Sequence, residues 1–263
     1  MWRRSVLTTA GVLLAMLLIN VCAPEGDEPA RVSLKVVSDG EHVTACENAQ
    51  RWSVELSALR LAIRDLEFTI EGETHARRMN RFLEMIAPRA LAHPGHYAGG
   101  DVTGELKGDF VLDMFAEDHR RLGEAVLLEG DYHGVNFYFR TASASDGLED
   151  GDPLLGHMAY LAGTATQEDQ SISFTATLDE LAENTQMVGG PFELAVTEDT
   201  EATLALQVYT VDPFENDTLF DGLDFGALDE DGDGVVDIVP GSEAHNILTK
   251  TLERHDHYGV SAQ

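Results

Sequence analysis

Apolar and polar side chains alternate over much of the chain from Val32 to Val211, and this pattern constrains the fold more than any other feature. Successive side chains of a β-strand point to opposite faces, so an apolar residue at every second position indicates a strand with one buried face. Clusters of Gly and Asp, such as residues 145–152, separate some of these segments and are typical of turns. The strand candidates are residues 32–36, 52–56, 59–63, 66–70, 102–112, 125–128, 135–140, 158–163, 171–178, 192–196 and 202–211.

Many short strands with turn residues between them favour an antiparallel β-sandwich or a β-barrel. The alternation changes phase at Arg64 and Asp65, which predicts a β-bulge or a break between two strands. The chain is long enough to bury a substantial core, as one domain or two small ones. We expect residues 31–263 to form a single β-rich domain.

Two segments leave the period of two and predict helices. Residues 74–90 place apolar side chains at helical spacing until Pro88, which indicates a helix inserted between strands. Residues 243–254 show the same spacing after Ser242, a residue type that commonly caps a helix N-terminus. An acidic loop precedes this second helix, so the loop is expected to join the last strand to the C-terminal helix.

The N-terminus has the features of an export signal. Arg3 and Arg4 precede a mostly apolar run from Val6 to Val21, which suits a secretory signal peptide and is short for a membrane span. The run ends at Cys22. Residues 23–30, rich in Pro, Glu, Gly and Asp, would then form a tether.

Residues 19–22, Ile-Asn-Val-Cys, resemble a bacterial lipobox. The resemblance implies that residues 1–22 hold the signal peptide, that Cys22 is lipidated and that the protein is a lipoprotein anchored to a membrane. Ala23 after the cysteine implies sorting to the outer membrane, with the protein facing the periplasm or the cell surface. The alternative is an ordinary signal peptide that is cleaved nearby.

Charge and cysteine content restrict the partners. The formal net charge is −30, from 17 basic and 47 acidic residues, which repels nucleic acid and anionic membrane surfaces and favours cations, so no nucleic-acid partner is expected. An acidic surface also suits a salty habitat without any acidic binding site. If Cys22 is lipidated, Cys46 has no partner for an intramolecular disulfide, so the fold must rest on its core.

One acidic segment, residues 229–237, has the spacing of a calcium-binding loop. Calcium takes about six to eight oxygen ligands, which a tight loop can supply from alternate positions around a glycine that makes a sharp turn. In this segment Val236 would pack beneath the loop. The predicted ligands are Asp229, Asp231 and Asp233 at positions one, three and five, the Val235 carbonyl at seven and Asp237 at nine, with Gly234 at six.

The segment resembles the EF-hand loop and its shorter relatives, the dockerin and thrombospondin type 3 loops. It departs from the EF-hand at position twelve, where Pro240 replaces the bidentate Glu, and no EF-hand helix is evident before it. We therefore expect a structural calcium ion with one or two further ligands from Asp217, Asp221 or Asp224. The alternative is an acidic, solvated turn.

Histidines form the second group of candidate ligands. Neutral imidazole binds zinc and copper well, and two histidines two or three residues apart can reach one ion. The alternative for these residues is a set of turn and edge histidines bonded to the backbone, and His42, His75 and His119 are expected to be exposed. The candidates for a transition-metal site, with copper or zinc as the ion, are His93, His96, His133, His157, His255 and His257.

A second resemblance concerns copper. Cys46 and residues 57–68 look like the opening of the copper-associated secreted lipoproteins found beside methanobactin systems, and residues 156–158 and 161–164 are similar to a later strand of that family. The match covers about a fifth of the chain. The family's several cysteines and its tryptophan-rich strand are missing here, so the resemblance assigns no ligand.

The sequence has no Gly-x-Ser-x-Gly elbow, His-Glu-x-x-His pair, phosphate loop or dinucleotide fingerprint. These observations favour a lipid-anchored, metal-binding extracytoplasmic protein without catalytic activity. Two alternatives stay open. One is a secreted enzyme that uses a histidine-bound metal, and the other is a structural or adhesive surface protein with calcium as a staple.

Overall fold

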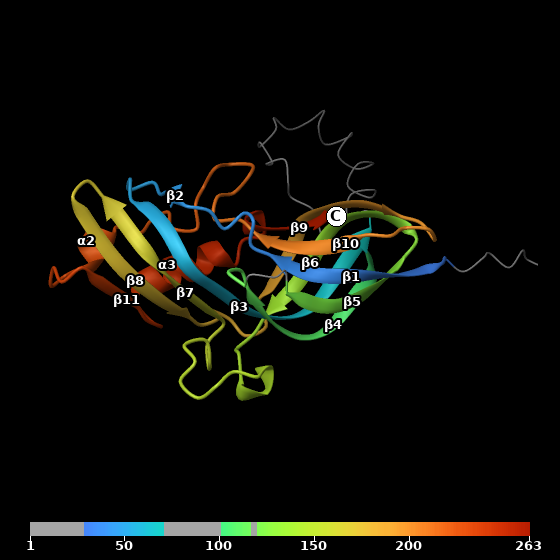
Figure 1. Cartoon of the computed structure of the whole chain (residues 1–263), viewed down its shortest axis with the longest axis horizontal. Helices are drawn as coiled ribbons and strands as arrows, with labels where there is room; N and C mark the ends of the chain where they lie inside the picture. The colour runs from blue at the N-terminus through green and yellow to red at the C-terminus, as the bar shows by residue number, and fades with distance from the viewer. Residues whose placement is uncertain (1–28, 71–100, 117–119) are drawn as a thin grey trace, which may run out of the picture.

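A computed structural model of the protein describes residues 29–70, 101–116 and 120–263 (Figure 1). The signal peptide with Cys22, most of the tether, the helix expected at 74–90 and the histidines His93 and His96 lie outside the described residues. No helix among the described residues is long and apolar enough to cross a membrane.

The protein is mainly β, as the alternation predicts, and every strand candidate overlaps an observed strand, although some candidates, such as 202–211, extend beyond it. The strands are β1 (Arg31–Asp39), β2 (Cys46–Glu47), β3 (Ser53–Ile70), β4 (Asp101–Asp113), β5 (Arg121–Leu128), β6 (Gly130–Phe139), β7 (Ala159–Gln167), β8 (Gln170–Leu178), β9 (Gln186–Val196), β10 (Thr203–Val208), β11 (Val235–Ile238) and β12 (Tyr258–Ala262).

The longest strand, β3, connects the two ends of the molecule. Its 18 residues pair with β7 over the first part and with β6 over the second. Asp65 has a φ of 51°, and the register with β4 shifts between Arg64 and Leu66, so the predicted irregularity is a bulge within one strand. Figure 1 shows β7, β8 and β11 at one end of β3 and β1, β4 and β5 at the other.

The twelve strands of the described residues belong to one sheet, in the order β11-β8-β7-β3-β4-β5-β1-β10-β12-β9-β6, with β2 beside β3 and a further pairing between β3 and β6. Three pairings are parallel, namely β1 with β10, β8 with β11 and β9 with β12. The sheet is therefore mixed, and the expectation of a purely antiparallel sheet is wrong for these pairs. Parallel neighbours need long connections, which the alternation pattern does not reveal.

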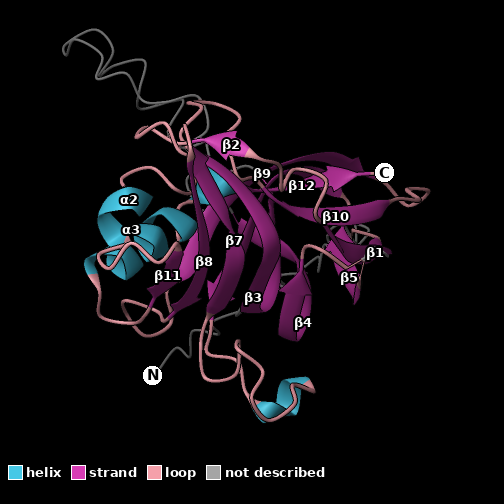
Figure 2. Ribbon diagram, turned by 60° about the vertical axis from the view of Figure 1, so that its left-hand side comes forward, coloured by secondary structure: helices cyan, strands magenta, loops and turns pink. Residues whose placement is uncertain are grey.

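Helices gather at the β11 end of the sheet, where Figure 2 shows α2 and α3 side by side. Helix α3 (Glu243–Leu252) confirms the predicted C-terminal helix, and the Ser242 hydroxyl accepts a hydrogen bond from the backbone N–H of His245 at 3.1 Å. The helix ends two residues before the predicted boundary, because residues 255–257 form a 3₁₀ turn, η2, that leads into β12. A second 3₁₀ turn, η1, spans Ala144–Asp146.

The acidic loop lies between the one-turn helix α2 (Phe225–Leu228) and β11. It does not follow the last strand, as the sequence suggested, because β11 separates it from α3. An aromatic cluster fixes α2 to the sheet: the ring of Phe225 lies 5.0 Å from Phe174 on β8 and 5.9 Å from Trp52 at the start of β3. All three side chains are buried, so the segment that begins the loop is held by the core.

Candidate metal centre

The loop from Asp229 to Gly234 is held at both ends. Before it, Asp224 caps α2 by accepting the backbone N–H of Ala227 at 3.3 Å, and its carboxylate also accepts the indole N–H of Trp52 at 3.2 Å. After it, β11 pairs with β8, beginning with Val235 opposite Ser173. Gly232 and Gly234 have φ angles of 72° and 77°, a conformation that glycine adopts without steric cost. The chain therefore makes two sharp turns between fixed ends.

Three carboxylates converge in this loop. Each of Asp229, Asp231 and Asp233 offers an oxygen atom, and these atoms lie within 4.8 Å of one another. Among the described residues, this is the only group of three or more His, Cys, Asp or Glu side chains that meets this spacing. Asp229 is partly buried, whereas Asp231 and Asp233 are exposed, so an ion would reach the group from solvent.

The loop's own backbone orients the carboxylates. Asp229 Oδ2 accepts the N–H of Gly234 at 3.1 Å, and Asp233 Oδ1 accepts the N–H of Val235 at 2.8 Å. Asp231 Oδ1 accepts the N–H of Asp233 at 3.4 Å. Asp229 Oδ1 is buried and has no hydrogen-bond partner among the described groups, and leaving a buried polar atom unpaired is costly. None of the three forms an ion pair with a described basic side chain.

The later positions of the loop differ in how they fit a ligand role. The Gly234 carbonyl accepts the N–H of Ser173 at 2.9 Å and so faces β8. Successive carbonyls of a strand point in opposite directions, so the Val235 carbonyl points away from β8. Asp237 instead accepts the hydroxyl of Thr175 at 2.6 Å and is not part of the three-carboxylate group. Val236 is buried, as predicted.

The three acids suggested as additional ligands are engaged elsewhere. Asp224 caps α2, and Asp221 accepts the backbone N–H groups of Ala49 and Thr218 at 2.7 and 2.9 Å. Asp217 pairs with Arg254 at 3.4 Å. Their nearness in sequence does not place them in the aspartate group, because each carboxylate is engaged in a cap, a turn or an ion pair of its own.

The described histidines are not gathered in a group of three ligands. His133 Nδ1 lies 2.9 Å from Glu193, His157 Nδ1 lies 2.7 Å from Asp179, and His255 Nε2 lies 2.8 Å from Asp256. His257 alone is fully buried, and its Nδ1 lies 2.9 Å from the carbonyl oxygen of Tyr209. Of the three histidines expected to be exposed, His42 is exposed, and His75 and His119 lie outside the described residues.

Cys46 is poorly suited to act as a nucleophile. Burial, together with the negative charge of Asp221, raises the pKa of its thiol to about 11. The thiolate is the reactive form, so the side chain stays a neutral, packed group at physiological pH.

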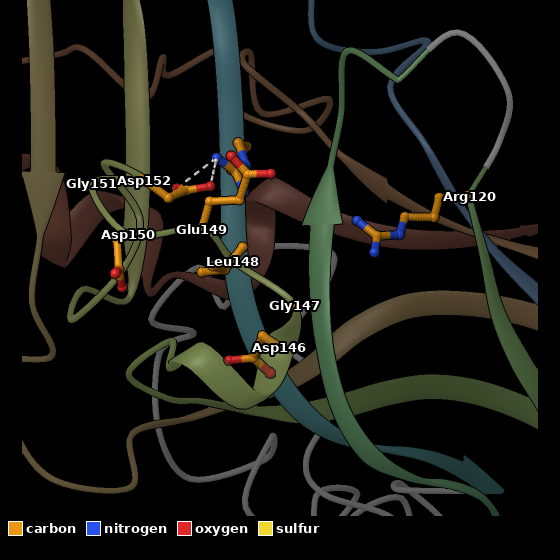
Figure 3. A pocket seen from close by; sticks show the side chains of 9 residues that line it. Arg120, Asp146, Gly147, Leu148, Glu149, Asp150, Gly151 and Asp152 are labelled. Carbon is orange, nitrogen blue, oxygen red and sulfur yellow. Dashed lines mark hydrogen bonds and ion pairs between the residues drawn. The ribbon is translucent and has the colours of Figure 1, made fainter.

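A cavity of about 420 Å³ is lined by Arg60 of β3, by Arg120 and by residues 146–152 of the loop that contains η1. Figure 3 shows Asp152 pairing with an arginine on β3, which is Arg60, through contacts of 2.9 and 3.1 Å. A second forked pair joins Arg140 to Asp146 at 2.6 and 2.8 Å, and it holds the pKa of Asp146 below its usual value. These pairs fasten the loop to the sheet, and the residues lining this cavity include no His or Cys.

Sequence reasoning assigned no site role to two residues that the structure sets apart. Asp212 is a fully buried carboxylate with one oxygen atom that has no partner, and His245 is a buried histidine whose Nε2 accepts the N–H of Asp179 at 3.0 Å. The burial of Asp212 depends on the conformation of the loop after β10, which no local sequence pattern predicts. His245 lies next to Ala244, which shares the apolar face of α3 with Leu248, and this position could have predicted that His245 is buried.

Comparison of the chain with protein-family models, with curated proteins and with solved structures gives no match.

Proposed function

We propose that this protein binds one calcium ion in the 229–237 loop and uses it as a structural staple, without catalytic activity. The observation that carries the proposal is the convergence of Asp229, Asp231 and Asp233 within 4.8 Å, with Asp229 Oδ1 buried and unpaired. A cation between these oxygens would remove their mutual repulsion and compensate the buried charge.

The donor set favours calcium over other ions. All the candidate atoms are oxygens, which suits hard cations, and the loop offers no nitrogen or sulfur for zinc or copper. Magnesium demands a strict octahedron with shorter bonds, whereas calcium tolerates the irregular geometry of a glycine-containing loop. The Val235 carbonyl would supply a further oxygen. Asp237 would have to exchange its hydrogen bond with Thr175 for the ion.

The place of the loop in the fold supports a staple. The loop connects α2, which the aromatic cluster holds, to β11, which pairs with β8 through residues 235–238. Helix α3 follows β11 and contacts β8 as well. An ion that orders the loop would therefore fix the edge of the sheet and the start of the C-terminal segment.

We infer further that the sheet closes on itself as a barrel, which is one of the two architectures that the sequence favours. The support is the pairing of β3 with β4 on one side and with β6 on the other. Between β4 and β6 the order runs without a gap through β5, β1, β10, β12 and β9.

We also propose that the protein is a lipoprotein attached to the outer membrane, in the periplasm or at the cell surface. The support is in the sequence: Arg3 and Arg4, the apolar run that follows, and Cys22 at its end. A net charge of −30 keeps such a domain soluble beside an anionic membrane and leaves the lipid as its means of attachment.

Thermal unfolding with and without calcium tests the staple. Ion binding to the folded state alone stabilises it by about 2.7 kcal/mol when calcium is at about 100 times its Kd, which corresponds to a rise in Tm of about 5–10 °C. We expect magnesium to give a smaller rise and a chelator to reverse the effect. Asp231→Ala with Asp233→Ala should abolish the response and leave the β-sheet spectrum in place.

A matched control is Asp199→Ala with Glu201→Ala, which removes the same charge from two exposed acids of the β9–β10 turn. This variant should respond to calcium as the wild type does. If the wild type and the loop variant melt at the same temperature with and without calcium, the loop is only an acidic turn.

Anchoring is tested by Cys22→Ser. We expect this change to abolish labelling of the protein by radioactive palmitate and to release it into the soluble fraction, because its lipid is the proposed membrane attachment. Cys46→Ser is the control and should remain anchored, because its thiol is buried in the core. Palmitate in the Cys22→Ser protein would contradict lipidation at this residue, as would a wild-type mature N-terminus other than Cys22.

A further inference from the structure

Strands β4 and β5 are paired at one end only, and the calcium proposal does not use this region. Strand β4 pairs with β3 along nearly all of its length. With β5 it pairs at two adjacent positions, the second of which is Glu105 with Val126. Beyond that position, residues 106–113 of β4 and residues 121–125 of β5 are not paired with each other. We call this open part of the junction the β4–β5 seam.

Backbone groups of β4 point into the seam. Met114, the residue after β4, donates its N–H to the Leu59 carbonyl of β3 at 3.0 Å, and the bonds of an antiparallel pair recur at every second residue. Leu112 and Phe110 therefore face β3 with their N–H and C=O groups. The N–H and C=O of Val111 point the other way, into the seam, where β5 does not pair with them. An open edge of this kind is a template for another strand.

The core is less well covered at the seam than elsewhere along these strands. Leu106 and Phe110 of β4 and Leu122 of β5 pack against the core but are only half-buried. Leu112 and Leu127, on the same two strands, have 0% exposure. A strand placed in the seam would therefore bury apolar surface as well as pair backbone groups.

A cleft of about 420 Å³ occupies the seam, lined by residues 109–111, residues 120–122 and two residues of η1. Its charged side chains are Asp109, Arg120, Arg121 and Asp146. Both acids pair with Arg140, at 3.5 and 2.6 Å, and Arg121 pairs with Glu124. Arg120 is exposed and forms no ion pair with a described acid, and Figure 3 shows its side chain reaching from the β5 side toward β4. An unpaired arginine in a chain of net charge −30 favours an acidic ligand group.

We propose that the β4–β5 seam binds an extended, acidic peptide segment of a partner protein, which adds as a strand between β4 and β5. Its backbone pairs with the open edge at Val111. Side chains of a strand alternate between two faces, so its apolar residues cover Phe110 and Leu122 and its acidic residues lie beside Arg120. Arg120 also lines the cavity over Arg60, but the exposed acids of residues 149–150 there repel an acidic ligand, which leaves the seam as its place.

Amide hydrogen exchange of the full chain, followed residue by residue by NMR, tests the open seam without a ligand. The Val111 amide should exchange at least about tenfold faster than the amides of Phe110 and Leu112, which are bonded to β3. Equal protection of Val111 and Leu112 would mean that the seam is already closed, and it would overturn the proposal. Protection of Val111 that disappears on dilution would assign the seam to a second copy of this chain, which also overturns it.

Random octapeptides displayed on phage are the probe for the partner. The wild type should enrich peptides in which acidic and apolar residues alternate, and a synthetic peptide of this kind should slow exchange at Val111. Arg120→Glu should weaken binding of that peptide at least about tenfold, because it places like charges together. Arg31→Glu, the same change at an exposed arginine of β1 outside the cleft, should bind it as the wild type does.

Two results of the selection would sink the proposal. One is a wild type that enriches no peptide beyond those that Arg120→Glu enriches. The other is a selected peptide that binds and leaves the exchange of Val111 unchanged, since it then lies outside the seam. Arg120 is exposed, so its replacement should leave the fold intact. None of these results bears on the calcium response.

Discussion

Burial controls the ionisation of two glutamates where α3 meets the loop after β8. Glu253 is the C-cap residue of α3 and accepts the backbone N–H of Leu181, next to Glu180. Each carboxylate has one buried oxygen atom without a partner among the described groups. Burial raises the pKa of both side chains, and the charge of Glu180 raises the pKa of Glu253 further.

This arrangement predicts a pH-dependent gain from Glu253→Gln. When the pKa of a carboxyl group is raised in the folded state, the folded protein loses stability as pH rises from the group's ordinary pKa of 4.5 through its folded-state pKa. Gln keeps the acceptor for Leu181 and removes the charge. The variant should therefore melt about 2–4 °C higher than the wild type at pH 7, and this advantage should vanish at pH 4.

The control for this prediction is Glu55→Gln, which removes the same charge from an exposed position on β3. It should change the melting temperature little at either pH, because an exposed carboxylate is well solvated. Equal melting of Glu253→Gln and wild type across the pH range would mean that the Glu253 carboxylate is solvated in the folded protein.

At the scale of elements, the features that could be predicted from the sequence are those that depend on residues close together in the chain. The alternation located β1 and β3 to β10 but not β2 or β11, the phase change at Arg64 and Asp65 located the bulge, and Ser242 located the start of α3. The strand β12 escaped prediction because Tyr258, Gly259 and Val260 are all buried, so the segment shows no alternation. Strand neighbours also escaped, since the pattern of a strand does not name its partner.

The same division applies to the candidate sites. The convergence of Asp229, Asp231 and Asp233 follows from their spacing in one tight loop, so sequence alone could propose it. A shared histidine site would have needed long-range contacts between the candidates, whereas in the structure each described candidate contacts a different partner. The burial of His257 likewise depends on a long-range contact, in which the Tyr209 N–H donates to the His257 carbonyl.

At the scale of the whole molecule, the last strand occupies an interior place in the sheet. Strand β12 lies between β10 and β9, as Figure 2 shows, pairing with β10 from Leu204–Ala262 to Val208–Tyr258 and with β9 at Val260–Phe192. The Tyr258 ring is fully buried, lies 5.1 Å from the ring of Phe137, and its hydroxyl donates to the Leu252 carbonyl at 2.7 Å.

Deletion of residues 254–263 should therefore prevent cooperative folding. The truncated chain would expose the backbone edges of both β9 and β10, and open edges pair with other chains. Loss of a buried aromatic side chain such as Tyr258 alone costs roughly 3–5 kcal/mol, a large part of the roughly 5–15 kcal/mol that stabilises a typical domain. The truncated protein should be insoluble, or bind a hydrophobic dye and lack a sharp melting transition. Deletion of residues 1–28 is the control and should leave a cooperative transition, because β1 begins at Arg31. A soluble chain ending at Glu253 that melts as sharply as the control would mean that β9 and β10 close against each other without β12.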